Sequence, residues 1–408
     1  MLNTPDSVKC FVPGSVPVSP TAHGNLDGIR IALKDVFAVE EHISSFGHLR
    51  WRDTHGPAKE NAIAVDRLLG SGAEVVGLTK LDQLAYSLIG NVGEGDWPLN
   101  TFDRNSYCGG SSSGSASAVA AGLADLGIGT DTAGSIRVPA AACGLFAIRT
   151  THGLIDLAGV IPLADSFDVV GILAQQVSLL MRTVEVLASS VPAPKRFHRV
   201  LVPEGIADQV QPATVAAMAA TASRISGACD LEIGQVDVSS LISSQVGDLF
   251  TRIQGREIWE NHGEWVSDNL EYLAPDVQER LRRAAKFHKD PDSVKEADAL
   301  AKASYVNSLN EVVGDQDVLL LPVVPREGPK LAWNDEELLN FRVQCFRLTG
   351  PSSLTSAPQV VFPTGVLGLG RFSLGLLGRK GSDLSLLSLV AELCGESDEA
   401  TARGNGRT

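Results

Sequence analysis

Short, largely apolar runs alternate with segments of helical spacing along the first part of the chain. Residues 29–33 and 74–78 are runs of strand length, and they predict buried strands. Between them, the apolar positions of residues 61–70 recur at the spacing of one helix face. A segment of small residues at 116–123 is also of helical type. Strands that alternate with helices are typical of an α/β layer, so we expect an α/β fold.

The second half of the chain continues this alternation. Strand-like runs lie at residues 199–202 and 318–323, and a last strand and helix precede residue 396. Helical spacing is found at residues 178–187, 212–225, 276–281 and 342–348.

No break in composition divides the chain, whose 408 residues are 44% hydrophobic. One large domain is therefore the simplest organisation. We expect an irregular lead-in at residues 1–25, a folded domain at 26–396 and a disordered tail at 397–408.

Charge and cysteine content narrow the possible partners. The formal net charge of −14 disfavours nucleic acid and anionic membranes as partners. The sequence has no run of about twenty apolar residues, so we expect no membrane span. The six cysteines form neither a disulfide framework nor a metal-ligand pattern. These features predict a cytoplasmic protein without a metal or a cofactor.

The segment richest in residues suited to catalysis or ligand binding runs from residue 108 to residue 151. It contains two turns rich in glycine and hydroxyl groups, at residues 109–113 and 129–135, on either side of the small-residue helix. Glycines allow tight turns and leave consecutive N–H groups free to point at an anion. Ser135 ends the second turn, so its hydroxyl is expected to lie beside such N–H groups, which is the arrangement that acyl transfer requires.

A serine nucleophile needs a base that accepts its proton. His152 is the only histidine near this segment, and it lies in a Thr-His-Gly turn that is typical of an ordinary loop. A lysine that burial keeps neutral is the other choice. Lys34 is the candidate, because it ends the apolar run at 29–33.

Plainer interpretations stay open at this stage. The Gly/Ser tract is also compatible with a flexible linker or a phosphate-binding loop, although it lacks the Gly-Lys-Ser/Thr ending of the latter. Ser112 and Ser113 are interpreted as turn-stabilising hydroxyls, with a hydrogen bond to the base or relay as an alternative role for one of them. The aromatic cluster Trp259, His262 and Trp265 fits either a packed helix face or a pocket wall.

The runs GIRIALKDVF, GGSSSGSASAVAAG and GTDTAGSIRVPAAACG together resemble the amidase signature hydrolases. The resemblance is specific over residues 26–168. It implies a single large α/β domain with a central mixed β-sheet flanked by helices, a signature core at residues 26–175 and a variable substrate-side region at about 194–315. Ala133 departs from the family pattern, which usually has a glycine there, and adds a methyl group to the turn.

The resemblance also implies roles for individual residues. Lys34 matches the general base, Ser111 the bridging serine that follows a cis peptide bond, and Ser135 the nucleophile. Backbone N–H groups of Thr132, Ala133, Gly134 and Ser135 would hold the oxyanion, and Ser112 is counted among the binding residues. Asp131 and Arg137 are interpreted as a buried structural pair.

The expected function is hydrolysis of a small carboxylic amide to ammonia and a carboxylate. The residues of the signature motifs, together with residues 44–48 and 261–265, are most similar to those of the short indole-3-acetamide hydrolases. This resemblance implies that the substrate is a small primary amide with an aromatic or apolar acyl side. The alternatives are a non-catalytic binding protein of the same fold and a glutamine-hydrolysing amidotransferase subunit. The resemblance leaves a homodimer open.

Overall fold

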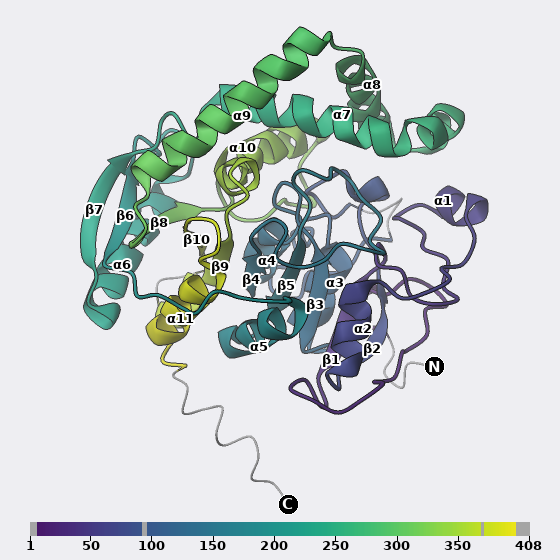
Figure 1. Ribbon diagram of the computed structural model, residues 1–408, viewed down its shortest axis with the longest axis horizontal. Coiled ribbons are helices and arrows are strands. Elements are labelled where there is room, and N and C mark those ends of the chain that lie inside the picture. Colours follow the sequence, from purple (N-terminus) through teal and green to yellow (C-terminus); the bar gives the residue numbers. More distant parts are fainter. Residues whose placement is uncertain (1–5, 92–95, 369–370, 397–408) are drawn as a thin grey trace, which may run out of the picture.

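Ten strands form one sheet at the centre of the computed structural model, which describes residues 6–91, 96–368 and 371–396 (Figure 1). The strand order is β2-β1-β3-β5-β4-β9-β10-β8-β6-β7. The strands are β1 Arg30–Lys34, β2 Glu74–Thr79, β3 Leu126–Thr130, β4 Phe146–Arg149, β5 Val170–Ala174, β6 Arg199–Glu204, β7 Glu232–Asp237, β8 Asp317–Pro322, β9 Gln359–Pro363 and β10 Ser373–Leu377.

The sheet is mixed. β1 pairs in parallel with β2 and β3, and β6 pairs in parallel with β7 and β8, whereas the pairs that join β3 to β8 through the middle are antiparallel. The expected α/β fold with a central mixed sheet flanked by helices is therefore confirmed.

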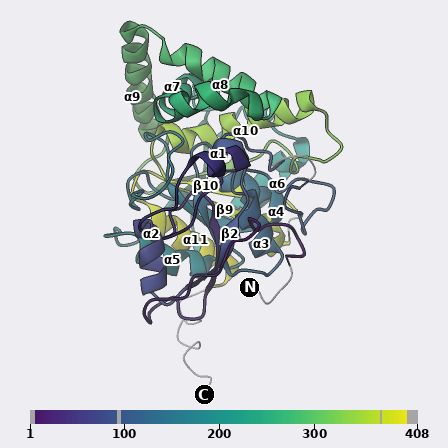
Figure 2. The same ribbon diagram turned by 90° about the vertical axis from the view of Figure 1, so that its right-hand side faces the viewer.

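The helices of the described residues surround this sheet and leave the central strands buried. They are α1 Leu49–Thr54, α2 Ile63–Gly70, α3 Ser113–Ala120, α4 Arg137–Cys143, α5 Val177–Leu187, α6 Pro212–Cys229, α7 Ser244–Asn269, α8 Pro275–His288, α9 Asp292–Val312, α10 Asp335–Leu354 and α11 Asp383–Cys394. In both ribbon views α7, α8 and α9 form a separate layer at one end of the molecule, and α10 lies between that layer and the strands (Figures 1 and 2). No helix in the described part of the chain is long and apolar enough to span a membrane.

Most elements expected from the apolar pattern are present, but α8 and α10 are longer than the helical segments expected at 276–281 and 342–348. The helix α9 was not expected. Within it, only Asp298, Tyr305 and Leu309 are buried, so its apolar stripe is too thin to identify from the sequence.

Residues 6–25 form no helix or strand, but they pack on the domain. Phe11 bridges to Thr79 and Val18 to Val75, both on β2, and Cys10 is fully buried. The predicted tail at 397–408 lies outside the described residues.

One glycine of β3 decides how closely the first serine turn approaches the sheet. A Cβ at Gly129 would lie 2.6 Å from the hydroxyl oxygen of Ser112, which no side chain tolerates. Glycine at this position therefore lets the start of α3 lie directly against the strand that leads to Ser135.

Candidate active site

Lys34, at the end of β1, is fully buried beside two hydroxyl groups. Its Nζ donates to Ser111 Oγ at 2.9 Å and to Thr130 Oγ1 at 2.8 Å. Burial lowers the pKa of Lys34 to about 8, although the nearby carboxylates of Asp82, Asp168 and Asp131 oppose that shift. Near neutral pH, part of the population therefore has a neutral amine that can accept a proton.

Thr130 is a site residue that the sequence analysis missed. It ends β3, whose parallel pairing with β1 sets Ile128 beside Leu33 and brings the strand end alongside Lys34. Ser112 donates instead to the Thr130 carbonyl at 3.4 Å, and the buried Ser113 hydroxyl has no partner in the described structure. A hydrogen bond to the base was an alternative role for Ser112 or Ser113, but Thr130 makes the bond to Lys34. The sequence does not show this contact, because it depends on the register between β1 and β3.

The turn that contains Ser111 and the turn that ends at Ser135 are joined by a backbone hydrogen bond. The N–H group of Ser112 donates to the carbonyl of Ser135 at 3.2 Å, and the carbonyl of Ser111 accepts from Asp82 N–H at 3.3 Å. The Gly110–Ser111 peptide bond is cis, as the resemblance implied. The fold thus brings Lys34, Ser111 and Ser135 into one site from three separate segments.

Ser135 combines a free hydroxyl with nearby free donors. The residue is only 3% exposed, yet its Oγ has no hydrogen-bond partner among the described residues and is not fully enclosed. Nothing in the described structure accepts from the N–H groups of Thr132, Ala133 or Ser135 itself. Unused N–H groups beside an unpaired hydroxyl are what an oxyanion site needs.

Gly134 does not fit its expected role. Its N–H donates to Asp131 Oδ1 at 2.7 Å, so the carboxylate already occupies that donor. The prediction that Gly134 supplies an oxyanion donor is therefore corrected. Gly134 instead provides the backbone conformation of the turn, with φ at 121°, a region that side chains rarely adopt.

The methyl group of Ala133 is accommodated without a left-handed backbone. The carbonyl of Ala133 accepts from Thr349 Oγ1 of α10 at 2.6 Å. This contact ties the turn before Ser135 to a helix more than two hundred residues away in the sequence.

An ionic core below the turn holds it in place. Asp131, Arg137 and Arg149 are all fully buried, and Asp131 lies 2.8 Å from Arg137 and 3.2 Å from Arg149. Burial alone would raise the pKa of Asp131, but the charges of both arginines outweigh burial and hold that pKa well below its ordinary range. The interpretation of Asp131 and Arg137 as a buried structural pair is confirmed, with Arg149 as a third member.

Asp168 supports the turn from the other side. It accepts from Thr132 Oγ1 at 2.5 Å and from the N–H groups of Leu163 and Ala164 at 2.7 and 2.9 Å. Burial raises the pKa of Asp168 to about 6 in spite of these bonds.

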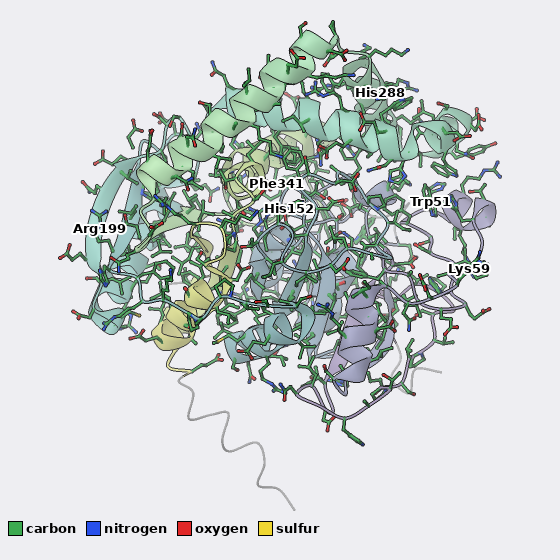
Figure 3. The ribbon with its side chains drawn as sticks, viewed as in Figure 1. Trp51, Lys59, His152, Arg199, His288 and Phe341 are labelled. Atoms are coloured by element: carbon green, nitrogen blue, oxygen red, sulfur yellow. The ribbon has the colours of Figure 1, made fainter. Side chains whose placement is uncertain are left out.

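The aromatic cluster of α7 is part of the packing between helices. His262 and Trp265 stack around Trp51 of α1, with ring centroids 5.4 and 4.9 Å from it, and His262 lies 2.6 Å from the Pro162 carbonyl. Figure 3 places Trp51 on α1, below the end of α7. Trp259 makes none of these ring contacts in the described structure, so the three residues do not form a common pocket wall.

The described residues contain no group of three His, Cys, Asp or Glu side chains arranged to hold a metal ion. A surface hollow of about 890 Å³ lies where β6, β7 and β8 begin, and it is lined by Arg199 and Asp317 among others. These two residues pair with each other at 2.6 Å.

Comparisons with known proteins find amidases among the similar chains. A family model described as Amidase matches residues 18–220. The chain is 33% identical to Amidase 1 of Oryza sativa subsp. japonica over 411 residues, which cover 93% of this chain and 92% of that protein. A solved structure described as "Crystal structure of amidase" is similar with a TM-score of 0.79 at 26% identity, covering 92% of this chain and 86% of the other.

A second kind of relative matches over a shorter stretch. A glutamyl-tRNA(Gln) amidotransferase subunit from Natronomonas pharaonis is 36% identical over 171 residues, 42% of this chain and 40% of that protein. The sequence likeness to this relative covers less than half of the chain, whereas the likeness to the rice amidase extends over nearly all of it.

Replacing Asp131 with asparagine tests the ionic core. Asp131→Asn leaves two buried guanidinium groups without a charge partner, so we expect the free energy of unfolding to fall by about 3 to 5 kcal/mol in urea titrations. Asp315→Asn is the matched control, because Asp315 pairs with Arg379 at the surface with its side chain 83% exposed, and should change stability by about 1 kcal/mol or less. Equal losses in the two variants would contradict a special role for the buried carboxylate.

Proposed function

The chain belongs to the amidase signature family of hydrolases, and on that premise we propose that it cleaves a small carboxylic amide through an acyl-enzyme on Ser135. The enzyme class, an amidase acting on linear amide C–N bonds, follows from the family. The observation that supports the mechanism is the buried Lys34 amine, within hydrogen-bond distance of Ser111 Oγ.

The first half of the proposed reaction forms the acyl-enzyme. Ser135 Oγ attacks the amide carbonyl carbon and passes its proton to Ser111, whose own proton moves to the neutral amine of Lys34. The free N–H groups of Thr132, Ala133 and Ser135 stabilise the negative charge that develops on the carbonyl oxygen. The C–N bond then breaks as the nitrogen takes a proton back through Ser111, and ammonia leaves.

The second half reverses the relay. Water attacks the ester carbon and gives its proton to Lys34 through Ser111, and the returning proton restores the Ser135 hydroxyl as the C–O bond breaks. The products are a carboxylate and the free enzyme. Asp168 and the ionic core of Asp131 keep the turn in place throughout, because they bond to its backbone and to Thr132.

For the substrate we propose a small primary amide, as in the indole-3-acetamide hydrolase subgroup. The whole-length likeness to the rice amidase favours an enzyme on free amides over an amidotransferase subunit. The presence of Lys34, Ser111 and Ser135 counts against a non-catalytic binding protein. Ammonia release by the purified lone chain from a panel of primary amides is the direct test, and release from glutamine alone would favour the amidotransferase alternative.

Ser135→Ala tests the nucleophile. Without the hydroxyl no acyl-enzyme forms, so ammonia release should fall by about a thousandfold or more in a coupled ammonia assay. Ser113→Ala is the matched control, since the Ser113 hydroxyl has no partner in the described structure and its loss should leave turnover close to that of the wild type. Wild-type activity in Ser135→Ala would exclude the proposed mechanism.

The pH profile tests the base. Only the neutral amine of Lys34 accepts a proton, and burial sets its pKa at about 8, so kcat/KM should fall about tenfold per pH unit below that value and level off above it. Lys34→Met should lose activity by about 100-fold or more and flatten the profile in this range. A wild-type profile that is flat from pH 6 to pH 9, measured at roughly constant ionic strength, would assign the base to another group.

A further inference from the structure

Arg342, on α10, is a buried cation without a partner among the described residues. It is 8% exposed, and its guanidinium makes no hydrogen bond or ion pair with any of them. Its only specific contacts there are the rings of Phe346 and Tyr86, 4.4 and 5.8 Å from the guanidinium carbon. Arg137, by contrast, directs its guanidinium nitrogens to four acceptor residues. A buried charge is unfavourable unless an opposite charge compensates it.

Arg280, on α8, contacts the ring of Tyr86, as Arg342 does. Its guanidinium carbon is 5.5 Å from the centre of Tyr86, and its Nε and Nη2 are enclosed but have no acceptor in the described structure. Its Nη1 donates to Asp276 at 2.8 Å, a carboxylate whose side chain is 51% exposed. We call Tyr86, Arg280 and Arg342 the Tyr86 cluster.

The Tyr86 cluster has an excess of positive charge. Burial lowers the pKa of Arg342 to about 9, and the charge of Arg280 adds to that shift. Burial raises the pKa of Tyr86, while Arg342, Arg280 and Arg283 oppose the rise. Asp276 hydrogen-bonds to Arg280, and the buried carboxylate of Asp82 is the other anion that interacts with this arginine. A site with several cations and few anions, in a chain of net charge −14, is suited to an incoming anion.

The Tyr86 cluster is connected to the turns of Ser111 and Ser135 through neighbours of its residues in the chain. In the sequence, Tyr86 lies between Asp82, whose N–H donates to the Ser111 carbonyl, and Leu88, whose carbonyl accepts from the Gly110 N–H. Arg342 precedes Thr349 by seven residues, so the two lie on the same face of α10 about 10 Å apart along its axis. Thr349 is the residue that holds the Ala133 carbonyl.

The figures show how α10 comes to occupy this place. The helix crosses between the outer helical layer and the strands in both views (Figures 1 and 2), and the labelled Phe341, which directly precedes Arg342, marks its position over the centre of the molecule in Figure 3. The helix that carries Arg342 therefore lies against both the turn of Ser135 and the outer helical layer.

From this geometry we propose that Arg342 and Arg280 bind a carboxylate at the far end of the substrate's acyl group. The proposal rests on the proposed amide hydrolysis, and it replaces the aromatic or apolar acyl side with one that ends in an anion. Because a primary amide releases only ammonia, any further group must belong to the acyl part. A carboxylate satisfies the free guanidinium N–H groups with charge-assisted hydrogen bonds. The substrate class is a dicarboxylic acid with one end as a primary amide.

Paired substrates test this assignment. Glutaramate and adipamate carry the terminal carboxylate, and pentanamide and hexanamide are neutral counterparts with a methyl group in its place. We expect the wild type to prefer the better carboxylate substrate over its counterpart by about 10- to 100-fold in kcat/KM, the range of a hydrogen-bonded charge pair. Equal values for both pairs would overturn the proposal while leaving amide hydrolysis intact.

Variants of α10 locate the effect. Arg342→Met should abolish the preference, chiefly through a higher KM for the carboxylate substrate, so that kcat/KM for that substrate falls to the value for its neutral counterpart. Arg347→Met is the matched control, since Arg347 is on the same helix and bonds Gln209 Oε1 at 3.2 Å instead. Equal effects of the two variants, or equal losses on both kinds of substrate, would contradict the assignment.

Stability provides a readout that does not depend on turnover. Arg342 has no described partner that its removal would leave unpaired, so Arg342→Met should melt at or above the wild-type temperature, whereas a structural arginine would lower it. Adipate should raise the melting temperature of the wild type but not of Arg342→Met, and adipamide should raise neither. If no amide is hydrolysed, the proposed function fails, and the absence of this selective stabilisation would separately overturn the anion site.

Discussion

The burial of one amine is the constraint on which the active site depends. Lys34 is enclosed at the end of a central strand, where water cannot solvate its charge and two hydroxyl groups are its hydrogen-bond partners. Three carboxylates favour the charged form, yet burial prevails and brings the pKa into the range in which both forms are populated. An exposed lysine in the same sequence position would stay protonated and could not serve as a base at neutral pH.

The same low-polarity interior requires that every other charge near the site be compensated. Asp131 meets this requirement with two arginines and with backbone N–H groups of the turn, so the carboxylate is both neutralised and used as a support. This has a consequence for the proposed mechanism: because Gly134 donates to Asp131, the oxyanion would be held by the remaining N–H groups of the turn. The support of the turn and the donors of the site therefore share one short stretch of backbone, and a change in Asp131 would affect both.

The residues of the proposed chemistry and those of the proposed anion site lie in different layers of the molecule. The sheet and the helices packed directly on it carry Lys34, Ser111 and Ser135, which perform the proposed chemistry. The outer layer and α10 carry Arg280 and Arg342, whose charges lack the compensation found around Asp131. Thr349 joins the two, because it lies on the helix of Arg342 and bonds the turn of Ser135. On this interpretation, reaction type and substrate preference are encoded in different parts of the chain.

The sequence alone determined the α/β class and most strands and helices, because apolar periodicity is a local feature. It also suggested Lys34 and Ser135 for the proposed relay, whereas Ser111 came from the resemblance to the family. It also identified Asp131 and Arg137 as a buried pair, since their spacing places them on one turn. Other features depended on which distant segments meet. The pairing of β3 with β1 brought Thr130 to Lys34, the carboxylate of Asp131 took the Gly134 N–H, and the packing of Trp51 on His262 and Trp265 made an aromatic cluster into core. Arg280 and Arg342 look like ordinary helix-surface residues in the sequence, and only the tertiary structure, by burying both against Tyr86 with the half-exposed Asp276 as their hydrogen-bonded carboxylate, makes them a candidate binding site.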